Sequence, residues 1–172
     1  MKAAGYRSVE QLRNGTPITI RAIRPDDKAR VVRAFHALER DSIYTRFFTA
    51  KKTLSADDLR RLTEVDQVRD VALVATIGNE EVLIGGARYM SSGMSAEIAF
   101  TVEEDYQRQG IASRLLRHLV HIGRANGIAR FEAYVLARNA SMLGVFRRSG
   151  LRTTQRRDGG QWLVTLELGN RL

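Results

Sequence analysis

The stretch from residue 96 to residue 126 constrains the fold more than any other part of the sequence. It opens with AEIAFTV, an apolar run of strand length, and passes through a polar loop into a helical pattern. The apolar residues of that helix form one stripe: Ile111, Leu115, Leu116, Leu119, Val120 and Ile122. A buried strand followed by such a helix requires a sheet and a helix layer that share a core. The stretch therefore predicts a layered domain of sheet and helices.

Hydrophobic patterns elsewhere predict the remaining elements. Strands are predicted at residues 16–23, 71–77, 82–89, 96–102, 131–136, 153–158 and 161–168. Helices are predicted at residues 24–39, 42–48, 55–63, 110–126 and 140–149. Consecutive strands joined by tight turns favour antiparallel pairing, and a Gly-Gly turn marks a terminal hairpin. We therefore expect an α/β (α+β) fold with a mixed, largely antiparallel central sheet flanked by helices.

The length of 172 residues favours a single domain over residues 1–172. The polar beginning with Gly5 predicts a loose N-terminal segment over residues 1–12. No stretch approaches 18 consecutive apolar residues, and the first ten residues lack the apolar core of a signal peptide. We therefore expect no membrane partner and a cytoplasmic location.

The absence of cysteine excludes disulfides, thiolate zinc sites and cysteine nucleophiles. The three histidines are His36, His118 and His121, and only the last two are spaced to share a helix face. No second pair of ligands accompanies them, so we expect no metal.

Basic residues outnumber acidic residues by 28 to 19, which gives a formal net charge of +9. Lysine stands only at positions 2, 28, 51 and 52, and arginine supplies the rest. Arginine binds phosphate and carboxylate through a planar fork, so this excess indicates an anionic partner or a charged, solvated surface. Aromatic residues make up 7% and are not interleaved with the basic ones, which argues against a nucleic-acid partner.

The sequence QRQGIA at residues 107–112 lies where the loop meets the helix. Backbone N–H groups at a helix start, together with the helix dipole, attract an anion. Gly110 permits close approach of the backbone, and Ala112 keeps the next turn small. We therefore expect a diphosphate held by main-chain amides. The alternative is an ordinary turn from loop to helix.

These residues resemble a known family. Residues 107–112 are similar to the Q/R-x-x-G-x-G/A motif by which the GCN5-related N-acetyltransferases (GNATs) bind the acetyl-CoA pyrophosphate. Asn139, Phe146 and Gly150 resemble the later motif N-x-x-A-x-x-x-Y-x-x-x-G-F, and the segment order resembles the GNAT fold over nearly the whole chain. The narrower resemblance is to the acetyltransferase domain of bacterial Pat-type protein lysine acetyltransferases, on AEIAFTV and on residues 16–26, 44–48 and 54–55.

The resemblance implies splayed strands at an acetyl-CoA site, with acetyl-CoA as co-substrate. The strand before the loop would pair with pantetheine, and the helix start would hold the diphosphate. The cofactor-binding residues implied are Ala99, Phe100, Thr101, Val102, Gln107, Arg108, Gln109, Gly110, Ile111, Ala112, Ser113, Arg114, Asn139, Met142 and Phe146. Arg108 and Arg114 are assigned by charge, with plain surface arginines as the alternative. Asn139 is also a good helix N-cap.

Acetyl transfer to an amine needs a base, because an amine with a pKa of about 10.4 is protonated at neutral pH. Glu97 lies on the strand next to the implied thioester, and it matches the glutamate base of the Pat-type resemblance. It is therefore the candidate catalytic residue. The alternative is a glutamate on the solvent face of the strand, alongside Ala99 and Thr101.

The later motif departs from the family at Phe146, where many members have a tyrosine that protonates the CoA thiolate. A thiol pKa of about 8.5 makes the thiolate a tolerable leaving group without an acid. Tyr134 and a water molecule remain alternatives for that proton.

The expected function is direct acetyl transfer from acetyl-CoA to a primary amine, with a protein lysine as the favoured acceptor and an acyl-CoA synthetase as one acceptor the resemblance suggests. The basic charge favours a lysine that stands among acidic residues. One alternative is a small-molecule amine or polyamine N-acetyltransferase with an acidic pocket from Glu39, Asp41, Glu64 and Asp66. Another is a non-catalytic CoA-binding regulatory domain. A monomer or a homodimer is expected.

Overall fold

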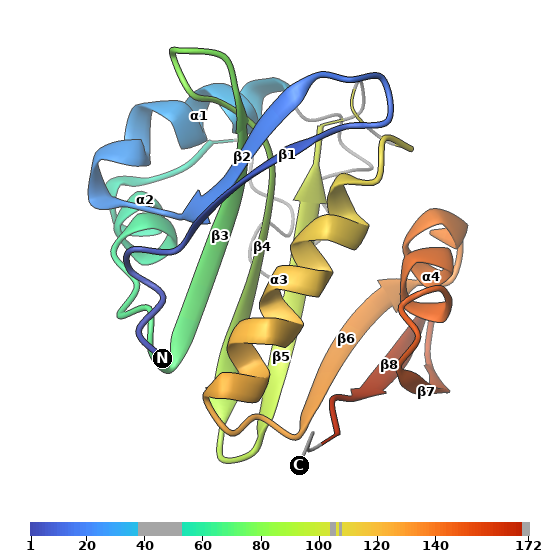
Figure 1. Ribbon diagram of the computed structural model, residues 1–172. Coiled ribbons are helices and arrows are strands. Elements are labelled where there is room, and N and C mark those ends of the chain that lie inside the picture. Colours follow the sequence, from blue (N-terminus) through green and yellow to red (C-terminus); the bar gives the residue numbers. More distant parts are fainter. Residues whose placement is uncertain (38–52, 104–105, 107, 170–172) are drawn as a thin grey trace.

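The computed structural model describes residues 1–37, 53–103, 106 and 108–169. Within them, eight strands form one sheet in the order β1-β2-β3-β4-β5-β6-β8-β7 (Figure 1). The strands are β1 (Arg7–Gln11), β2 (Pro17–Ala22), β3 (Asp70–Ile77), β4 (Val82–Ser92), β5 (Ser95–Val102), β6 (Arg130–Leu136), β7 (Arg152–Asp158) and β8 (Gln161–Glu167). The helices are η1 (Pro25–Asp27), α1 (Lys28–Ala37), α2 (Ala56–Thr63), α3 (Ile111–Ala125) and α4 (Ala140–Arg147). Only β5 and β6 run parallel, which confirms a mixed, largely antiparallel sheet.

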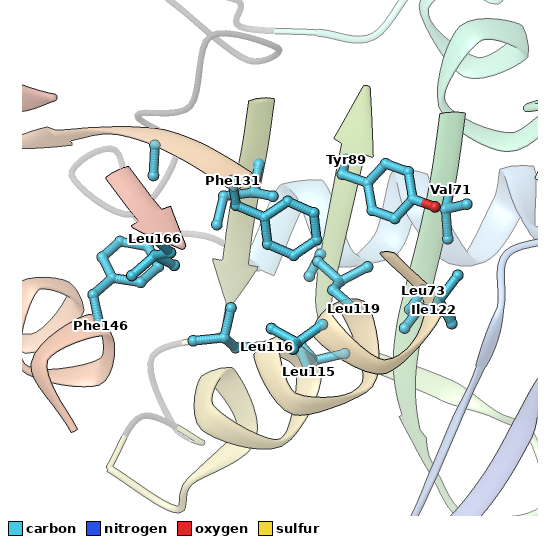
Figure 2. Close-up of a cluster of buried hydrophobic side chains, with 14 of the residues drawn as sticks. Val71, Leu73, Tyr89, Leu115, Leu116, Leu119, Ile122, Phe131, Phe146 and Leu166 are labelled. Carbon is cyan, nitrogen blue, oxygen red and sulfur yellow. The ribbon is translucent and has the colours of Figure 1, made fainter. Parts of the chain in front are cut away.

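Alternation along the strands gives the sheet two faces with separate cores. The larger core lies under α3 and α4, which stand in front of the sheet in Figure 1. Figure 2 shows its centre, where Leu119 of α3 and Phe131 of β6 lie among other buried side chains. On the opposite face, Val31 of α1 and Leu62 of α2 join a smaller core with Val74 of β3. This second layer borders the central strands β3 and β4.

The predicted helix at residues 55–63 is confirmed, together with its capping residues. Ser55 Oγ accepts a hydrogen bond from the Asp58 N–H at 3.1 Å, and Asp58 Oδ2 accepts one from the Ser55 N–H at 2.9 Å. These two bonds satisfy backbone donors that a helix start leaves unpaired. The predicted helix at 24–39 opens as η1 and continues as α1 to Ala37, where the described segment ends. The helix predicted at 42–48 lies outside the described residues.

A buried ion pair fixes the start of α1 to the sheet. Arg21 of β2 and Asp27 of η1 are 3% and 0% exposed, and two N–H···O bonds of 2.8 and 2.7 Å join them. Burial alone would raise the pKa of the Asp27 carboxyl, but the hydrogen bonds from Arg21 and from the Arg24 N–H outweigh it and hold that pKa low. Because α1 carries Val31, this pair also positions one wall of the smaller core.

The expectation of a loose segment over residues 1–12 is wrong for its second half. Arg7–Gln11 form β1, an edge strand paired antiparallel with β2. Polar contacts tie this strand to α3: Tyr6 Oη and His118 Nδ1 are 2.5 Å apart, and His118 Nε2 and Glu10 Oε2 are 2.5 Å apart. The strand has a largely exposed surface, so its sequence lacks the apolar alternation that announces a buried strand.

Candidate functional site

The parallel strands β5 and β6 pair over a short length and then separate. Their register comprises three pairs, from Ser95 opposite Arg130 to Glu97 opposite Glu132. Beyond Glu97, β5 continues beside β4 to Val102, and β6 continues beside β8 to Leu136. The two strands therefore diverge into a wedge, which confirms the predicted splay. The predicted residues Ala99, Phe100, Thr101 and Val102 form the β5 side of this wedge.

The residues at the start of α3 have an unusual backbone conformation. Gly110 is the N-cap residue of α3 with φ of +84°, and Arg108 has φ of +65°. The first turn of α3 holds no acidic residue, and no side chain caps the Gly110 position. A Cβ added to Gly110 would lie 2.5 Å from Arg114 Nη1, so the Arg114 side chain would have to move, and the positive φ itself favours glycine. The first amides of the helix, including those of Ile111, are thus directed toward the loop with no anionic cap of their own.

Glu97 stands at the last paired position before the wedge opens. It is half-buried and lies on the face of the sheet opposite α3, since Ala96 and Ile98 beside it belong to the larger core. Its neighbours in register are Met90 on β4 and Glu132 on β6. Glu97 thus stands at the closed end of the wedge, two residues before the predicted pantetheine-pairing residues that begin at Ala99.

An apolar pocket of about 90 Å³ adjoins that strand on the Glu97 side of the sheet. Its walls come from α1, α2 and strands β3 to β5, with Gly86, Ala99 and Thr101 nearest the wedge. Arg88 also lines it and donates from Nη2 to the Leu62 carbonyl at 2.7 Å. Burial lowers the pKa of the Arg88 guanidinium to about 10, against the opposing charge of Asp70, so this group stays charged at neutral pH.

Comparison with known proteins identifies this arrangement. The family model described as "Acetyltransferase (GNAT) family" matches residues 35–151. The chain belongs to the GNAT acetyltransferase family. Acetyl-CoA is the acetyl donor that gives this family its activity, and the wedge, the uncapped start of α3 and the glycine at position 110 fit such a ligand.

Individual relatives of this GNAT domain are named acetyltransferases, and two of those described below carry the name Pat. The chain is 34% identical over 143 residues to the acetyltransferase Pat of Mycolicibacterium smegmatis, with 81% of this chain and 43% of that protein covered. It is 30% identical over 142 residues to the acetyltransferase PA5475 of Pseudomonas aeruginosa, with 80% and 76% covered. The solved GNAT domain of S. lividans PAT superposes with a TM-score of 0.84 at 35% identity, over 94% of this chain and 96% of that one. The chain thus spans less than half of the M. smegmatis protein.

In the structure the Arg114 guanidinium contacts backbone carbonyls at the start of α3 and in β1. Its Nη1 donates to the carbonyls of Gln109 and Gly110, each at 3.1 Å, and its Nη2 donates to the Gln11 carbonyl at 2.8 Å. In this GNAT domain Arg114 therefore links the start of α3 to the end of β1. Arg13, which no sequence motif marks, also lies near this position, with its Nε 3.9 Å from where a Gly110 Cβ would stand. Arg108 and Ser113 are exposed, Ala112 is half-buried, and Gln107 lies outside the described residues.

The residues predicted on α4 lie on the other side of the wedge. Asn139 is the N-cap of α4, and its Oδ1 accepts from the Met142 N–H at 3.1 Å, as its alternative assignment predicted. Phe146 is 1% exposed, and its ring packs edge-on against Phe100 with centroids 5.9 Å apart. This contact joins α4 to β5 and places an apolar ring where the family motif has a tyrosine. Met142 is half-buried against the larger core.

The carboxylates proposed for a polyamine pocket are engaged elsewhere. Glu64 forms an ion pair with Lys28 at 2.9 Å. Asp66 Oδ1 accepts from three successive backbone N–H groups, which lowers the pKa of its carboxyl. Glu39 and Asp41 lie outside the described residues. Within the described ranges, no group of three histidine or acidic side chains is arranged to hold a metal, and no helix is long and apolar enough to span a bilayer.

Proposed function

We propose that this GNAT domain transfers the acetyl group of acetyl-CoA directly to the side-chain amine of a protein lysine, with Glu97 as general base. The observation that carries the proposal is the place of Glu97 at the last pair before the β5–β6 wedge. The likeness to proteins named Pat supports a protein acceptor. The absence of cysteine and the single acidic residue at this point of β5 favour direct transfer over a covalent enzyme intermediate.

The reaction removes two protons from the acceptor ammonium and exchanges the carbon–sulfur bond of the thioester for a carbon–nitrogen bond. The acceptor ammonium gives a proton to the Glu97 carboxylate, directly or through water, because only the neutral amine is nucleophilic. The amine nitrogen then bonds to the thioester carbon, and the carbon–sulfur bond breaks. The sulfur leaves as a thiolate, which takes a proton from the amide-forming nitrogen or from solvent. The protein contributes position above all, since holding two reactants together lowers the entropic barrier.

The first experiment incubates the purified chain with radiolabelled acetyl-CoA and a bacterial lysate. We expect label on macromolecules that survives nuclease and is lost with protease. Label confined to small molecules would instead identify a metabolite N-acetyltransferase. Bound acetyl-CoA without any transfer would favour the regulatory alternative.

Glu97→Gln tests the general base. We expect kcat to fall about 10² to 10⁴-fold at neutral pH with acetyl-CoA binding unchanged, because the variant keeps the shape and loses the basic oxygen. The difference in kcat between the variant and the unmodified protein should decrease as the pH approaches about 10, where solvent deprotonates the amine. Rates across pH with a lysine peptide measure both effects. Glu80→Gln, an exposed glutamate in the β3–β4 turn, is the matched control. A constant defect at all pH values would contradict a base role for Glu97.

A further inference from the structure

The half of the sheet formed by β6, β8 and β7 has one covered face and one open face. Phe131, Val164 and Leu166 belong to the larger core, so the face that carries them lies under α3 and α4. The opposite face holds the alternate residues, and among the described elements no helix lies behind it in Figure 1. We call the residues on this face of β6, β8 and β7 the open face. It continues directly from Glu97 on β5.

A single row of residues crosses the open face from Glu97. The strand register sets Glu97 opposite Glu132 on β6, Glu132 opposite Thr165 on β8, and Thr165 opposite Thr154 on β7. On β7, Arg152 and Arg156 stand two residues to either side of Thr154 and on the same face. Neighbouring strands lie about 4.8 Å apart, so β7 lies about 14 Å from β5 along this row.

The charge of the side chains changes sign from the Glu97 end of this row to the β7 end, where Arg152 and Arg156 flank Thr154. Two carboxylates stand at the wedge, and two exposed guanidinium groups stand at the sheet edge. Within the described residues, neither Arg152 nor Arg156 has a salt-bridge partner. Between the two ends, Tyr134 and Leu163 face each other in register and are half-buried, which leaves apolar surface accessible. The exposed Glu167 of β8 stands in register between Arg130 and Arg152 and offsets part of their charge, whereas Arg156 faces Leu163.

We propose that the open face docks an acidic segment of the acceptor protein, with its target lysine over Glu97 and its acidic residues over Arg152 and Arg156. This rests on the proposed function. An extended chain advances about 3.3 Å per residue, so the 14 Å row sets the acidic residues about four positions from the lysine. The arrangement repels a free polyamine from β7, whereas it complements a protein segment that carries both signs of charge.

The test compares two synthetic peptides of equal length, each with one lysine. One has aspartates about four positions from the lysine on both sides, and the other has asparagines there. With the full chain and acetyl-CoA, we expect the acidic peptide to have a kcat/KM about five- to tenfold higher at low salt. This preference should shrink toward unity as the ionic strength rises from about 0.05 M to about 0.5 M, because exposed pairs are screened.

Reversing two charges on β7 then tests whether the preference for the acidic peptide arises on the open face. Arg152→Glu combined with Arg156→Glu should abolish or invert the preference for the acidic peptide. Lys2→Glu combined with Arg7→Glu makes the same change at the opposite edge of the sheet and should leave the preference intact. Unchanged acetyl-CoA binding by both variants shows that the fold is retained.

The outcomes separate this proposal from the proposed function. Equal rates for the two peptides, or a preference unaffected by the β7 reversal, overturn the docking proposal and leave lysine acetylation in place. Failure to acetylate any peptide or protein overturns both. A preference lost equally in the control variant would indicate only a long-range charge effect and also overturns docking at this face.

Discussion

Gly110 combines a positive φ with a close contact to the Arg114 side chain. Its φ of +84° is costly for a residue with a side chain, and a Cβ there would lie 2.5 Å from the guanidinium that links the start of α3 to the end of β1. Gly110→Ala should therefore displace Arg114 and the start of α3. We expect the Kd for acetyl-CoA to rise about tenfold or more, measured by calorimetry.

The matched control for this substitution is Gly78→Ala. Gly78 also has a positive φ, of +72°, but nothing lies within 4 Å of its added Cβ. Both variants should lose about 1 kcal/mol of stability from the backbone alone. Only Gly110→Ala should lose affinity for acetyl-CoA. An equal loss of affinity in both variants would show that general destabilisation causes the effect.

At the residue scale, sequence reasoning succeeded where one residue defines a backbone shape. Gly110 and Asn139 were recognisable because a helix start demands a glycine or a capping side chain at a fixed position. Arg114 was assigned from charge, and charge does not reveal that three carbonyls hold the guanidinium. Arg13 lies nearly a hundred positions before the loop, so only the pairing of β1 with β2 brings it there.

At the element scale, the start of α1 depends on one buried ion pair. Asp27→Asn removes the charge that balances Arg21, and an uncompensated buried guanidinium is costly. We expect the free energy of unfolding to fall by about 3 kcal/mol, near the lower end for such pairs because Glu81 still contacts Arg21 at 3.0 Å. Urea denaturation measures this change.

The adjacent Asp26 supplies the control for Asp27. Its side chain is 71% exposed and pairs with the exposed Arg24, so Asp26→Asn should change stability by less than about 0.5 kcal/mol. Because α1 forms a wall of the apolar pocket, Asp27→Asn should also raise the KM of the acetyltransferase. Similar stabilities for the two variants would contradict a structural role of the pair.

Helices and strands were predictable wherever a buried face makes apolar residues recur at regular spacing along the sequence. Strands β2 to β6, strand β8 and helices α2 to α4 carry such patterns, whereas the exposed β7 was predicted from the Gly-Gly turn beside it. Their predicted positions agree with the structure to within a few residues. β1 carries no such pattern, because it is an edge strand held by polar contacts of Tyr6 and Glu10 with His118. The splay of β5 from β6 came from the family resemblance and has no signature in the local pattern.

At the scale of the whole molecule, the carboxylates predict loss of stability in acid. Arg21 and the Arg24 N–H lower the pKa of Asp27 against the effect of burial, and His118 and Arg117 do the same for Glu10. Such groups stabilise the folded state above their unfolded pKa, and that stability is lost as the pH falls through the folded pKa. Burial and Asp66 raise the pKa of Asp70, which contributes in the opposite direction.

We therefore expect the urea midpoint to fall between about pH 5 and about pH 3, with most of the loss below the ordinary carboxyl pKa of about 4. Glu10→Gln should flatten this fall, because the variant has no proton to take up at that position. A midpoint that rises on acidification would show that Asp70 dominates the balance.

The three-pair junction between β5 and β6 also affects how the molecule opens. Strands β1 to β5 form one hydrogen-bonded group and β6 to β8 another. Among the described residues, the backbone joins them through that short ladder and through the bonds from the Ala129 and Arg130 N–H groups to the Met94 carbonyl. A ligand that lies along the wedge would contact both β5 and β6 and so hold the two groups of strands together. Amide protons of β6 and β8, although remote from the start of α3, should then exchange with deuterium more slowly in the presence of acetyl-CoA.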